Sequence, residues 1–535
     1  MKTDRYITRR ASLPLIGGGI LLVGRTAELR AAEPSPIAET VQGRVRGASV
    51  EGVHIYRGIP YAGPTSGKAR FLPPSRPAKQ PGVRDATITG PRCVQSPGNI
   101  FLNPVIGEYF GGGRHDRIEL ARQVDSEDCL NVNILTPGLA GKRAVLVYIH
   151  GGGLTNGSSA LTLYSDRFVR EQDVVLVGVN HRLNVFGYTY LGDLSPKYAT
   201  GNVGQLDLVA ALEWIRDNIS HFGGDPGNVT IFGESGGGAK ISALLAMPAA
   251  KGLFHKACVQ SGSALRASTA DEGAKAARQL LTNLGLSEGQ VDQLADIPAD
   301  KLLAAGAGRG AASAIVIDGH SLTHQTWDDK APEQSATVPM IIGNDKDEST
   351  LFSTRDAELF SLDDQGLRSR LMKAGIPESS VSSLLSIYRR DHPAETPTDL
   401  YFRISTDRGA RRNAARQAEL KAAQNKANVY VYYCQWNTPL AQEGRKIKAF
   451  HTSDLPLTMR LTLFPESEQL SRQLSGAWAA FAKTGNPGQK GLAWPAYTAD
   501  RRSTMVFDGP RSKAVDDPDH DERIALLNFP SGGLL

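Results

Sequence analysis

Four short apolar runs, rich in β-branched residues, divide the middle of the chain and constrain its fold most strongly. They cover residues 144–149, 174–179, 229–232 and 338–342. Each run is continuous rather than alternating, which is typical of a strand buried on both faces. Between the second and third runs, residues 206–218 carry apolar side chains at helical spacing and are followed by Gly223-Gly224. Alternating strands and helices predict an α/β protein with a mostly parallel central sheet flanked by helices.

Two longer segments, residues 266–312 and 355–425, are rich in alanine and in charged residues and read as helical. We expect them to form helical insertions that pack over the sheet. The basic run 408–416 within the second segment predicts a solvated helix face.

The first 32 residues have the pattern of an export signal. Arg9-Arg10 stands directly before the apolar run 13–23, whose eleven residues are too few to span a bilayer, which needs about 20. The pattern resembles a twin-arginine signal peptide and implies bacterial export, to the periplasm or the medium. An N-terminal membrane anchor is the alternative. We expect residues 33–535 to form a single domain without stable membrane insertion.

Charge and cysteine content exclude some functions. The formal net charge is +5, but residues 1–32 hold six cations and two anions, so the remainder carries only +1. This gives no basis for a nucleic-acid partner. The four cysteines have no C-x-x-C spacing, so we expect no zinc site, and no cofactor is implied.

Ser235 is the predicted nucleophile. The sequence Gly233-Glu234-Ser235-Gly236-Gly237 follows the third apolar run and precedes a helix of small residues, which is the context of a nucleophile elbow. Residues 285–289 match the same G-x-S-x-G pattern, but no strand precedes them. Ser287 is therefore interpreted as the cap of the next helix.

A glycine loop ends the first apolar run. His150 is followed by three glycines, whose lack of side chains lets backbone N–H groups approach a substrate carbonyl. The N–H groups of Gly152, Gly153 and Gly236 are the predicted oxyanion hole. A simple glycine-rich turn is the alternative interpretation.

Further blocks extend these motifs over nearly the whole chain past residue 32. The blocks are Arg57-Gly58-Ile59-Pro60-Tyr61-Ala62, Glu127-Asp128-Cys129-Leu130-Asn131, Asn180-His181-Arg182-Leu183, and Phe222-Gly223-Gly224-Asp225-Pro226. With the serine motif, they resemble the bacterial type B carboxylesterases of the carboxylesterase/cholinesterase family. The resemblance implies an α/β-hydrolase fold with helical insertions over the active site.

The resemblance also implies the other members of a catalytic triad. The family's acidic block corresponds to residues 343–348 and assigns Glu348, with Asp347 as the competitor. The family's histidine block corresponds to residues 449–454 and assigns His451. The chain order of serine, acid and histidine is that of α/β-hydrolases.

The implied function is hydrolysis of a small-molecule carboxylic ester by water through an acyl-enzyme intermediate. We expect short- to medium-acyl esters as substrates. A lipase and a specialised xenobiotic or carbamate ester hydrolase are the alternatives, and a non-catalytic adhesion-type relative is a further one. The pattern leaves the natural substrate, the acyl and alcohol pockets and the oligomeric state open.

The family resemblance also pairs Cys93 with Cys129 in a disulfide. Cys258 and Cys434 are then expected to be free thiols.

Overall fold

The apolar runs of the sequence form neighbouring strands of one sheet in a computed structural model. The structure describes residues 35–96, 104–110, 123–307, 313–529 and 531. Eleven strands form the main sheet in the order β18-β17-β14-β13-β12-β11-β9-β10-β8-β4-β3. The seven strands from β17 to β10 pair in parallel, and the remaining strands pair antiparallel. The prediction of a mostly parallel sheet is confirmed.

In sheet order, the strands are β18 (Lys513–Asp516), β17 (Ser503–Phe507), β14 (Val429–Cys434), β13 (Met340–Asp345), β12 (Lys256–Gln260), β11 (Gly224–Glu234), β9 (Arg143–Ile149), β10 (Val175–Val179), β8 (Asn131–Thr136), β4 (Val53–Pro60) and β3 (Ala48–Val50). A three-stranded sheet contains β1 (Ile37–Thr40), β2 (Gly43–Arg46) and β5 (Val83–Asp85). Two short pairs join β6 (Arg92–Cys93) to β7 (Asp125–Ser126) and β15 (Ala441–Gln442) to β16 (Arg445–Lys446).

Helices cover both faces of the main sheet. Successive side chains of a strand point to opposite faces, and a continuous apolar strand therefore presents apolar side chains that must be buried on both. On β9, Val145 and Val147 belong to one buried cluster, whereas Leu146 and Tyr148 belong to another. The first cluster includes side chains of α5 (Val203–Asn218), α6 (Gly236–Leu244), α7 (Ala270–Asn283) and α12 (Arg412–Ala423). The second includes side chains of α3 (Asp166–Gln172), α13 (Asp454–Thr458) and α14 (Glu468–Thr484).

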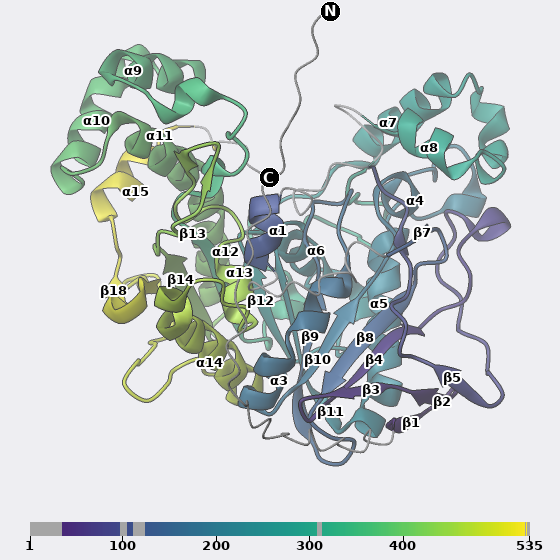
Figure 1. The fold of residues 1–535 in the computed structure, drawn as a ribbon. Coiled ribbons are helices and arrows are strands. Elements are labelled where there is room, and N and C mark those ends of the chain that lie inside the picture. Colours follow the sequence, from purple (N-terminus) through teal and green to yellow (C-terminus); the bar gives the residue numbers. More distant parts are fainter. Residues whose placement is uncertain (1–34, 97–103, 111–122, 308–312, 530, 532–535) are drawn as a thin grey trace, which may run out of the picture. The chain divides into compact units, whose positions relative to one another are not determined.

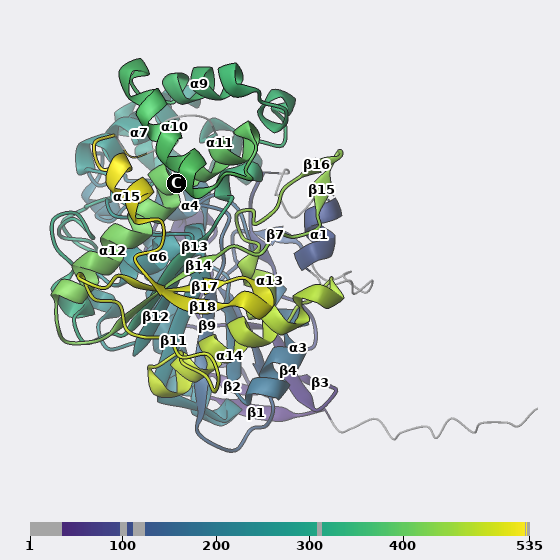
Figure 2. The same ribbon diagram turned by 90° about the vertical axis from the view of Figure 1, so that its left-hand side faces the viewer.

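The two expected helical insertions are present (Figures 1 and 2). The first follows β12 and contains α7 and α8 (Ala299–Ala305). The second follows β13 and contains α9 (Asp364–Lys373), α10 (Glu378–Asp391) and α11 (Pro397–Thr406) before α12. Helices α9, α10 and α11 share a separate apolar core with α15 (His520–Leu526). Short helices α1 (Pro104–Phe110) and α4 (Asn184–Tyr188) complete the set named here.

The expectation of a solvated basic face at 408–416 is wrong for its first residue. Arg408 is buried, and its guanidinium donates a hydrogen bond to the carbonyl of Ala374. A π-helical turn, Asp407–Arg411, joins α11 to α12 at this point and turns Arg408 inward. Arg416, one turn into α12, is exposed as expected.

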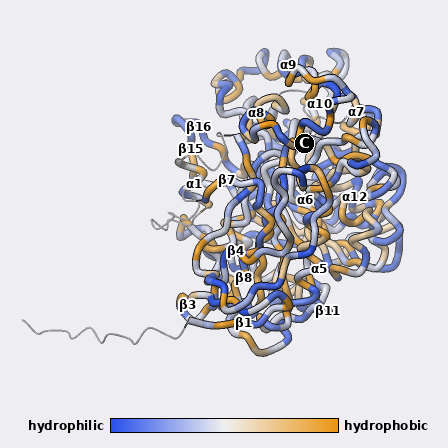
Figure 3. The backbone as a smooth tube through the Cα atoms, turned by 90° about the vertical axis from the view of Figure 1, so that its right-hand side faces the viewer, coloured by the Kyte–Doolittle hydropathy of each residue, from blue (hydrophilic) through white to orange (hydrophobic). Residues whose placement is uncertain are grey.

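Residues Ser35–Leu535 form one compact unit, and the proposed leader lies outside the described residues. The hydropathy colouring of Figure 3 shows apolar stretches in its interior and hydrophilic stretches along α9. Among the described residues, no helix combines the length and apolar character needed to cross a membrane.

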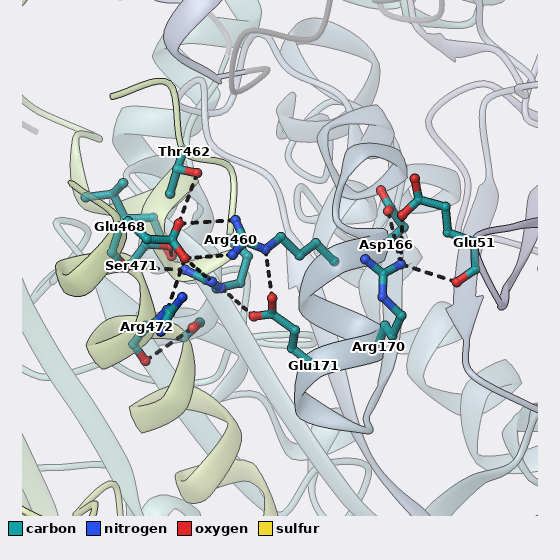
Figure 4. Close-up of polar contacts among 12 residues, drawn as sticks. Glu51, Asp166, Arg170, Glu171, Arg460, Thr462, Glu468, Ser471 and Arg472 are labelled. Atoms are coloured by element: carbon teal, nitrogen blue, oxygen red, sulfur yellow. Dashed lines mark hydrogen bonds and ion pairs between the residues drawn. The ribbon is translucent and has the colours of Figure 1, made fainter. Parts of the chain in front are cut away.

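An ion network fastens α14 to α3 (Figure 4). The Glu468 carboxylate, at the start of α14, accepts hydrogen bonds from Arg460 at 2.7 Å and from Arg167 of α3 at 2.6 Å. Arg460 is buried and also donates to Glu171 at 2.7 Å. Although burial works against it, these arginines lower the pKa of Glu468 to about 2. The network therefore joins two of the helices that cover one face of the sheet.

Candidate active site

Ser235 occupies a strained turn between β11 and α6. Its backbone angles are φ 57° and ψ −125°, in a region that residues with a side chain rarely adopt. Its N–H donates to the Gln260 carbonyl of the neighbouring strand β12, and its carbonyl accepts from Ala239 in α6. The serine is thus fixed from both sides at the end of a central strand, as the sequence predicts.

The glycines around Ser235 allow close backbone contacts. A Cβ on Gly236 would lie 2.1 Å from the Gly153 carbonyl oxygen, and one on Gly237 would lie 2.1 Å from the Ile149 carbonyl oxygen. The start of α6 therefore packs directly on the end of β9 and its glycine loop. Even the smallest side chain at Gly236 would displace that loop.

The glycine loop holds its N–H groups free. Gly152 and Gly153 adopt left-handed backbone angles, φ 86° and φ 61°, and the Gly152 carbonyl accepts from Asn156 in a tight turn. Within the described part of the chain, the N–H groups of Gly152, Gly153 and Gly236 donate to no protein acceptor. The structure brings these three glycines together beside Ser235.

His451 is bound to Glu348. The N–H of Asp347 donates to the Ala449 carbonyl, and Asp347 pairs with Phe450 in a parallel bridge. Glu348 follows Asp347 and His451 follows Phe450, so this pairing places Glu348 and His451 side by side. The Glu348 carboxylate Oε2 makes a short hydrogen bond to His451 Nδ1.

The Glu348 carboxylate is held on its other oxygen as well. Oε1 accepts hydrogen bonds from the Ser261 hydroxyl at 2.7 Å and from the Asp345 N–H at 2.8 Å. Ser261 directly follows β12, as Ser235 follows β11, so parallel pairing brings both to the same sheet edge. Sequence reasoning missed Ser261 because no local motif marks it.

Asp347, the competitor for the acid role, faces elsewhere. Its carboxylate lies 3.5 Å from the Lys346 ammonium and accepts from the Ala449 N–H at 3.3 Å. Burial raises its pKa, and Lys346 opposes the shift. Among the described residues, no hydrogen bond or ion pair joins Asp347 to His451.

Glu234 is a further acidic group at the imidazole, and sequence reasoning gave it no role. Its Oε1 lies 3.2 Å from His451 Nε2, the nitrogen that a triad turns toward the serine. Burial raises the pKa of Glu234 well above its usual range. Burial opposes protonation of His451, but Glu234 and Glu348 outweigh it and raise the pKa of His451 to about 9. The only sequence signal for Glu234 is its place in the serine pentapeptide.

Further buried polar groups surround the segment that follows His451 in the sequence. Asp454 accepts hydrogen bonds from the Tyr432 hydroxyl at 2.6 Å and from the Gln260 amide at 2.9 Å. Ser453 donates to Asp345 at 3.0 Å. These bonds fix the segment that follows His451.

Phe352 flanks the imidazole. Its ring centroid is 5.0 Å from that of His451, and the side chain is about half exposed, at 52%. An apolar ring in this position can contact a substrate that approaches the histidine. The loop that carries it has no motif from which the sequence could predict it.

The second G-x-S-x-G match is separate from this site. Ser287 is exposed and begins a 3₁₀ turn, Glu288–Ala295, with Gln290 bonded back to its N–H. The interpretation of Ser287 as a helix cap is confirmed.

All four cysteines are buried and free in the structure. The predicted Cys93–Cys129 disulfide is therefore not formed in it, although the two side chains are hydrogen-bonded neighbours. That contact and burial raise the pKa of the Cys129 thiol. The bridge stays a prediction, as does the expectation that Cys258 and Cys434 are free thiols.

In the described part of the chain, one group of side chains has metal-ligand spacing. His392, Asp519 and Glu522 lie at the ends of α10 and α15. His392 already pairs with Glu522 at 3.0 Å, and Asp519 pairs with Arg411 at 2.7 Å. The group contains none of the predicted site residues.

A parallel sheet that carries a strained serine at the end of a central strand, before a helix, is the arrangement of the α/β-hydrolases. The fold and the serine turn place the chain in this class.

Comparison with known proteins specifies the family. The profile of the carboxylesterase family matches residues 34–525. The chain is 35% identical to the para-nitrobenzyl esterase of Bacillus subtilis, over 93% of this chain and 99% of that protein. It is 31% identical to the human cocaine esterase, over 92% and 91% of the two chains. The crystal structure of a Geobacillus stearothermophilus carboxylesterase matches with a TM-score of 0.77 and 35% identity, over 92% of this chain and 99% of that one.

The chain therefore belongs to the carboxylesterase family and has the α/β-hydrolase fold. Membership identifies it as a carboxylic ester hydrolase, as the sequence predicts.

Proposed function

We propose that the chain hydrolyses short- to medium-acyl carboxylic esters with a Ser235–His451–Glu348 triad. The observation that carries the proposal is the Glu348–His451 bond beside a serine held at a strained strand end. Glu348 fixes the imidazole through Nδ1, which leaves Nε2 for proton transfer. Asp347 is disfavoured as the acid because its carboxylate is engaged by Lys346 and Ala449.

The proposed reaction has two halves. His451 Nε2 accepts the Ser235 proton as the hydroxyl oxygen attacks the ester carbonyl, and the imidazolium then protonates the leaving alcohol. Water attacks the acyl-serine by the same route and releases the acid. Before the first step, Nε2 turns from Glu234 toward Ser235, since catalytic hydrogen bonds often form only in the substrate complex.

The oxyanion hole in this proposal consists of the N–H groups of Gly152, Gly153 and Gly236. Their lack of protein acceptors supports the role, because these donors are available to a substrate oxygen. The loop is already folded by its own turn, so little reorganisation is needed when the oxyanion forms.

The substrate class is proposed from the family and from the site. The relatives include a para-nitrobenzyl esterase and a cocaine esterase, whose names refer to esters of small organic molecules. Phe352 offers an apolar contact for such a group beside His451. A lipase and a specialised xenobiotic or carbamate hydrolase are the alternatives. The presence of all three groups of the proposed triad argues against a non-catalytic adhesion-type role.

The experiment is a chain-length series on the purified enzyme. We expect p-nitrophenyl acetate and butyrate to be cleaved faster than p-nitrophenyl palmitate, with a rapid burst of nitrophenol from acyl-enzyme formation. A rate maximum on emulsified long-chain triglyceride would instead favour the lipase, and a carbamate preferred over every simple ester would favour the specialised hydrolase.

We further propose that residues 1–32 direct export to the periplasm or the medium and that residues 33–535 form the catalytic domain. The paired arginines before a short apolar run support the first proposal. In an oxidising compartment, the neighbouring Cys93 and Cys129 thiols would be able to form the predicted disulfide. Mass mapping of the exported protein with and without reduction tests the bridge.

A further inference from the structure

Lys240 is a buried lysine on the helix that begins at the proposed nucleophile. It lies in α6, five residues after Ser235, and is 0% exposed. Its ammonium Nζ donates a hydrogen bond to the carbonyl oxygen of His150 at 3.0 Å. In the part of the chain that the structure describes, no carboxylate forms an ion pair with it.

The surroundings of Lys240 give its charge no compensation. A buried ammonium without a counter-charge is costly, and burial lowers the pKa of Lys240 to about 7. The titratable groups that face it are His150, at the end of β9, and His181, after β10, whose rings stack with centroids 4.5 Å apart. Burial and the Lys240 charge lower the pKa of both histidines. A histidine side chain is either neutral or positively charged, so neither of them balances the charge of Lys240.

The His150 carbonyl is the point where the glycine loop leaves β9. His150 is the residue directly before Gly151, and the two free N–H groups of the loop follow it. The third free N–H belongs to Gly236, the first residue of α6. One hydrogen bond from Lys240 thus joins the helix that carries one donor to the strand end that carries the other two.

The backbone ladder between β9 and β11 ends at the pair Tyr148–Phe232, two residues before His150. Beyond it, the glycines of α6 lie close to the carbonyls of Ile149 and Gly153, and such contacts limit approach but do not prevent separation. The Lys240 hydrogen bond opposes separation. The amine of Lys240 has N–H donors in both its protonated and its neutral form, so this bond persists on either side of its pKa of about 7, and a hydrogen bond in a dry interior is stronger than one exposed to water.

We propose that Lys240 is a positioning residue of the oxyanion hole, which holds the His150 carbonyl and with it the Gly152–Gly153 donors in register with the Gly236 donor. This inference rests on the proposed function. Lys240 acts through the loop and does not touch the substrate.

The test compares two buried lysines. Lys421, in α12, is also 0% exposed and donates to the backbone carbonyls of Ser335 and Ala336 at 2.7 and 2.9 Å. Burial lowers its pKa to about 8. Lys421→Met therefore removes the same kind of interaction away from the glycine loop, and it serves as the matched control for Lys240→Met.

Two readouts separate positioning from a general structural role. For Lys240→Met we expect kcat on p-nitrophenyl butyrate to fall by about 100-fold, the loss for a misplacement of about 1 Å, while KM changes by less than about 3-fold. We also expect weaker inhibition by an alkyl trifluoromethyl ketone, which forms an oxyanion on the serine, and unchanged inhibition by the corresponding methyl ketone. Lys421→Met should match the wild type in both readouts.

Equal losses in the two lysine variants, or equal weakening of both ketones, would overturn the inference. Thermal unfolding and circular dichroism establish that each variant is folded, and Lys240→Gln, which keeps a shorter neutral donor, replaces Lys240→Met if the latter does not fold. We expect an intermediate kcat for Lys240→Gln, and a wild-type kcat would contradict the positioning role. Failure of the proposed function is distinguishable, because Ser235→Ala would then retain hydrolysis in the otherwise wild-type enzyme.

Discussion

Ser235 and Thr452 both hold left-handed backbone angles, one at the proposed nucleophile and the other directly after the proposed base. Such conformations cost on the order of 1–3 kcal/mol each for residues other than glycine. The surrounding hydrogen bonds hold Ser235 in place, from Gln260 on one side and Ala239 on the other. Strain therefore lies at the proposed nucleophile and at the residue next to the proposed base.

Substitution of Glu348 and of Asp347 distinguishes which of the two is the acid of the proposed triad. Glu348→Gln removes the charge that orients the imidazole, and we expect kcat to fall by about 10⁴-fold, as in a comparable protease triad. Asp347→Asn should reduce activity far less because Asp347 does not contact His451. The measurement is steady-state kinetics of both variants on p-nitrophenyl butyrate. Equal losses would leave the acid unassigned.

The pH dependence follows from the carboxylates around His451. Only neutral imidazole accepts the serine proton, so kcat/KM should rise with pH, with a midpoint near the pKa of about 9 rather than the ordinary 6.5 of histidine. Glu234 and Glu348 favour the imidazolium, and Glu234→Gln removes one of these charges. The midpoint of the variant should therefore move down toward 6.5. A pH–rate profile that is identical in both enzymes would contradict the assigned cause.

At the scale of single residues, local motifs predict only part of the site. Ser235 and the glycines stand in recognisable patterns, and the family resemblance supplies Glu348 and His451. Ser261 and Lys240 were not predictable in this way, because their roles depend on parallel strand pairing and on a helix packed against a neighbouring loop. Glu234 stands next to the serine in sequence, but only the fold shows that its carboxylate reaches the imidazole.

At the scale of elements, the continuous apolar runs predict β9, β10, β11 and β13 because strands buried on both faces need apolar residues throughout. The helical insertions also follow from composition. The inward turn of Arg408 does not, since a π-helical turn shifts the helix face by a residue and leaves no clear mark on the periodicity. Short edge strands such as β18 carry too few residues for a pattern.

The α3–α14 network gives a stability prediction. Glu468→Gln removes one of the two carboxylates that pair with the buried Arg460, and we expect the free energy of unfolding to fall by about 1.5–3 kcal/mol, the range for charged hydrogen bonds. Glu288→Gln breaks an exposed ion pair with Arg278 and should change the free energy of unfolding by about 1 kcal/mol at most. Urea unfolding of both variants measures the difference, and equal effects would contradict the network's role.

Acid should remove the Glu468 contribution. Its pKa is depressed from the ordinary 4.5 to about 2, so the stabilisation is fully present above pH 4.5 and is lost as the pH falls toward 2. The gap between wild type and Glu468→Gln should close over that range. A gap that stays constant would show that charge is not the cause.

At the scale of the whole molecule, one sheet collects the site from distant parts of the sequence. Ser235, Glu348 and His451 follow β11, β13 and β14, and parallel pairing brings these strand ends to one edge. The order of the strands in the sheet is a property of the fold, which the sequence pattern alone does not determine. The family match over residues 34–525 agrees with this arrangement.

The most direct test of the proposed mechanism is the pair Ser235→Ala and Ser287→Ala, combined with peptide mapping of the acyl-enzyme trapped by acid quench. We expect Ser235→Ala to lose nearly all hydrolysis of p-nitrophenyl butyrate and the nitrophenol burst, and Ser287→Ala to keep both. In the wild type, the butyryl group should map to Ser235. Hydrolysis retained by Ser235→Ala, or a butyryl group on another residue, would contradict the triad.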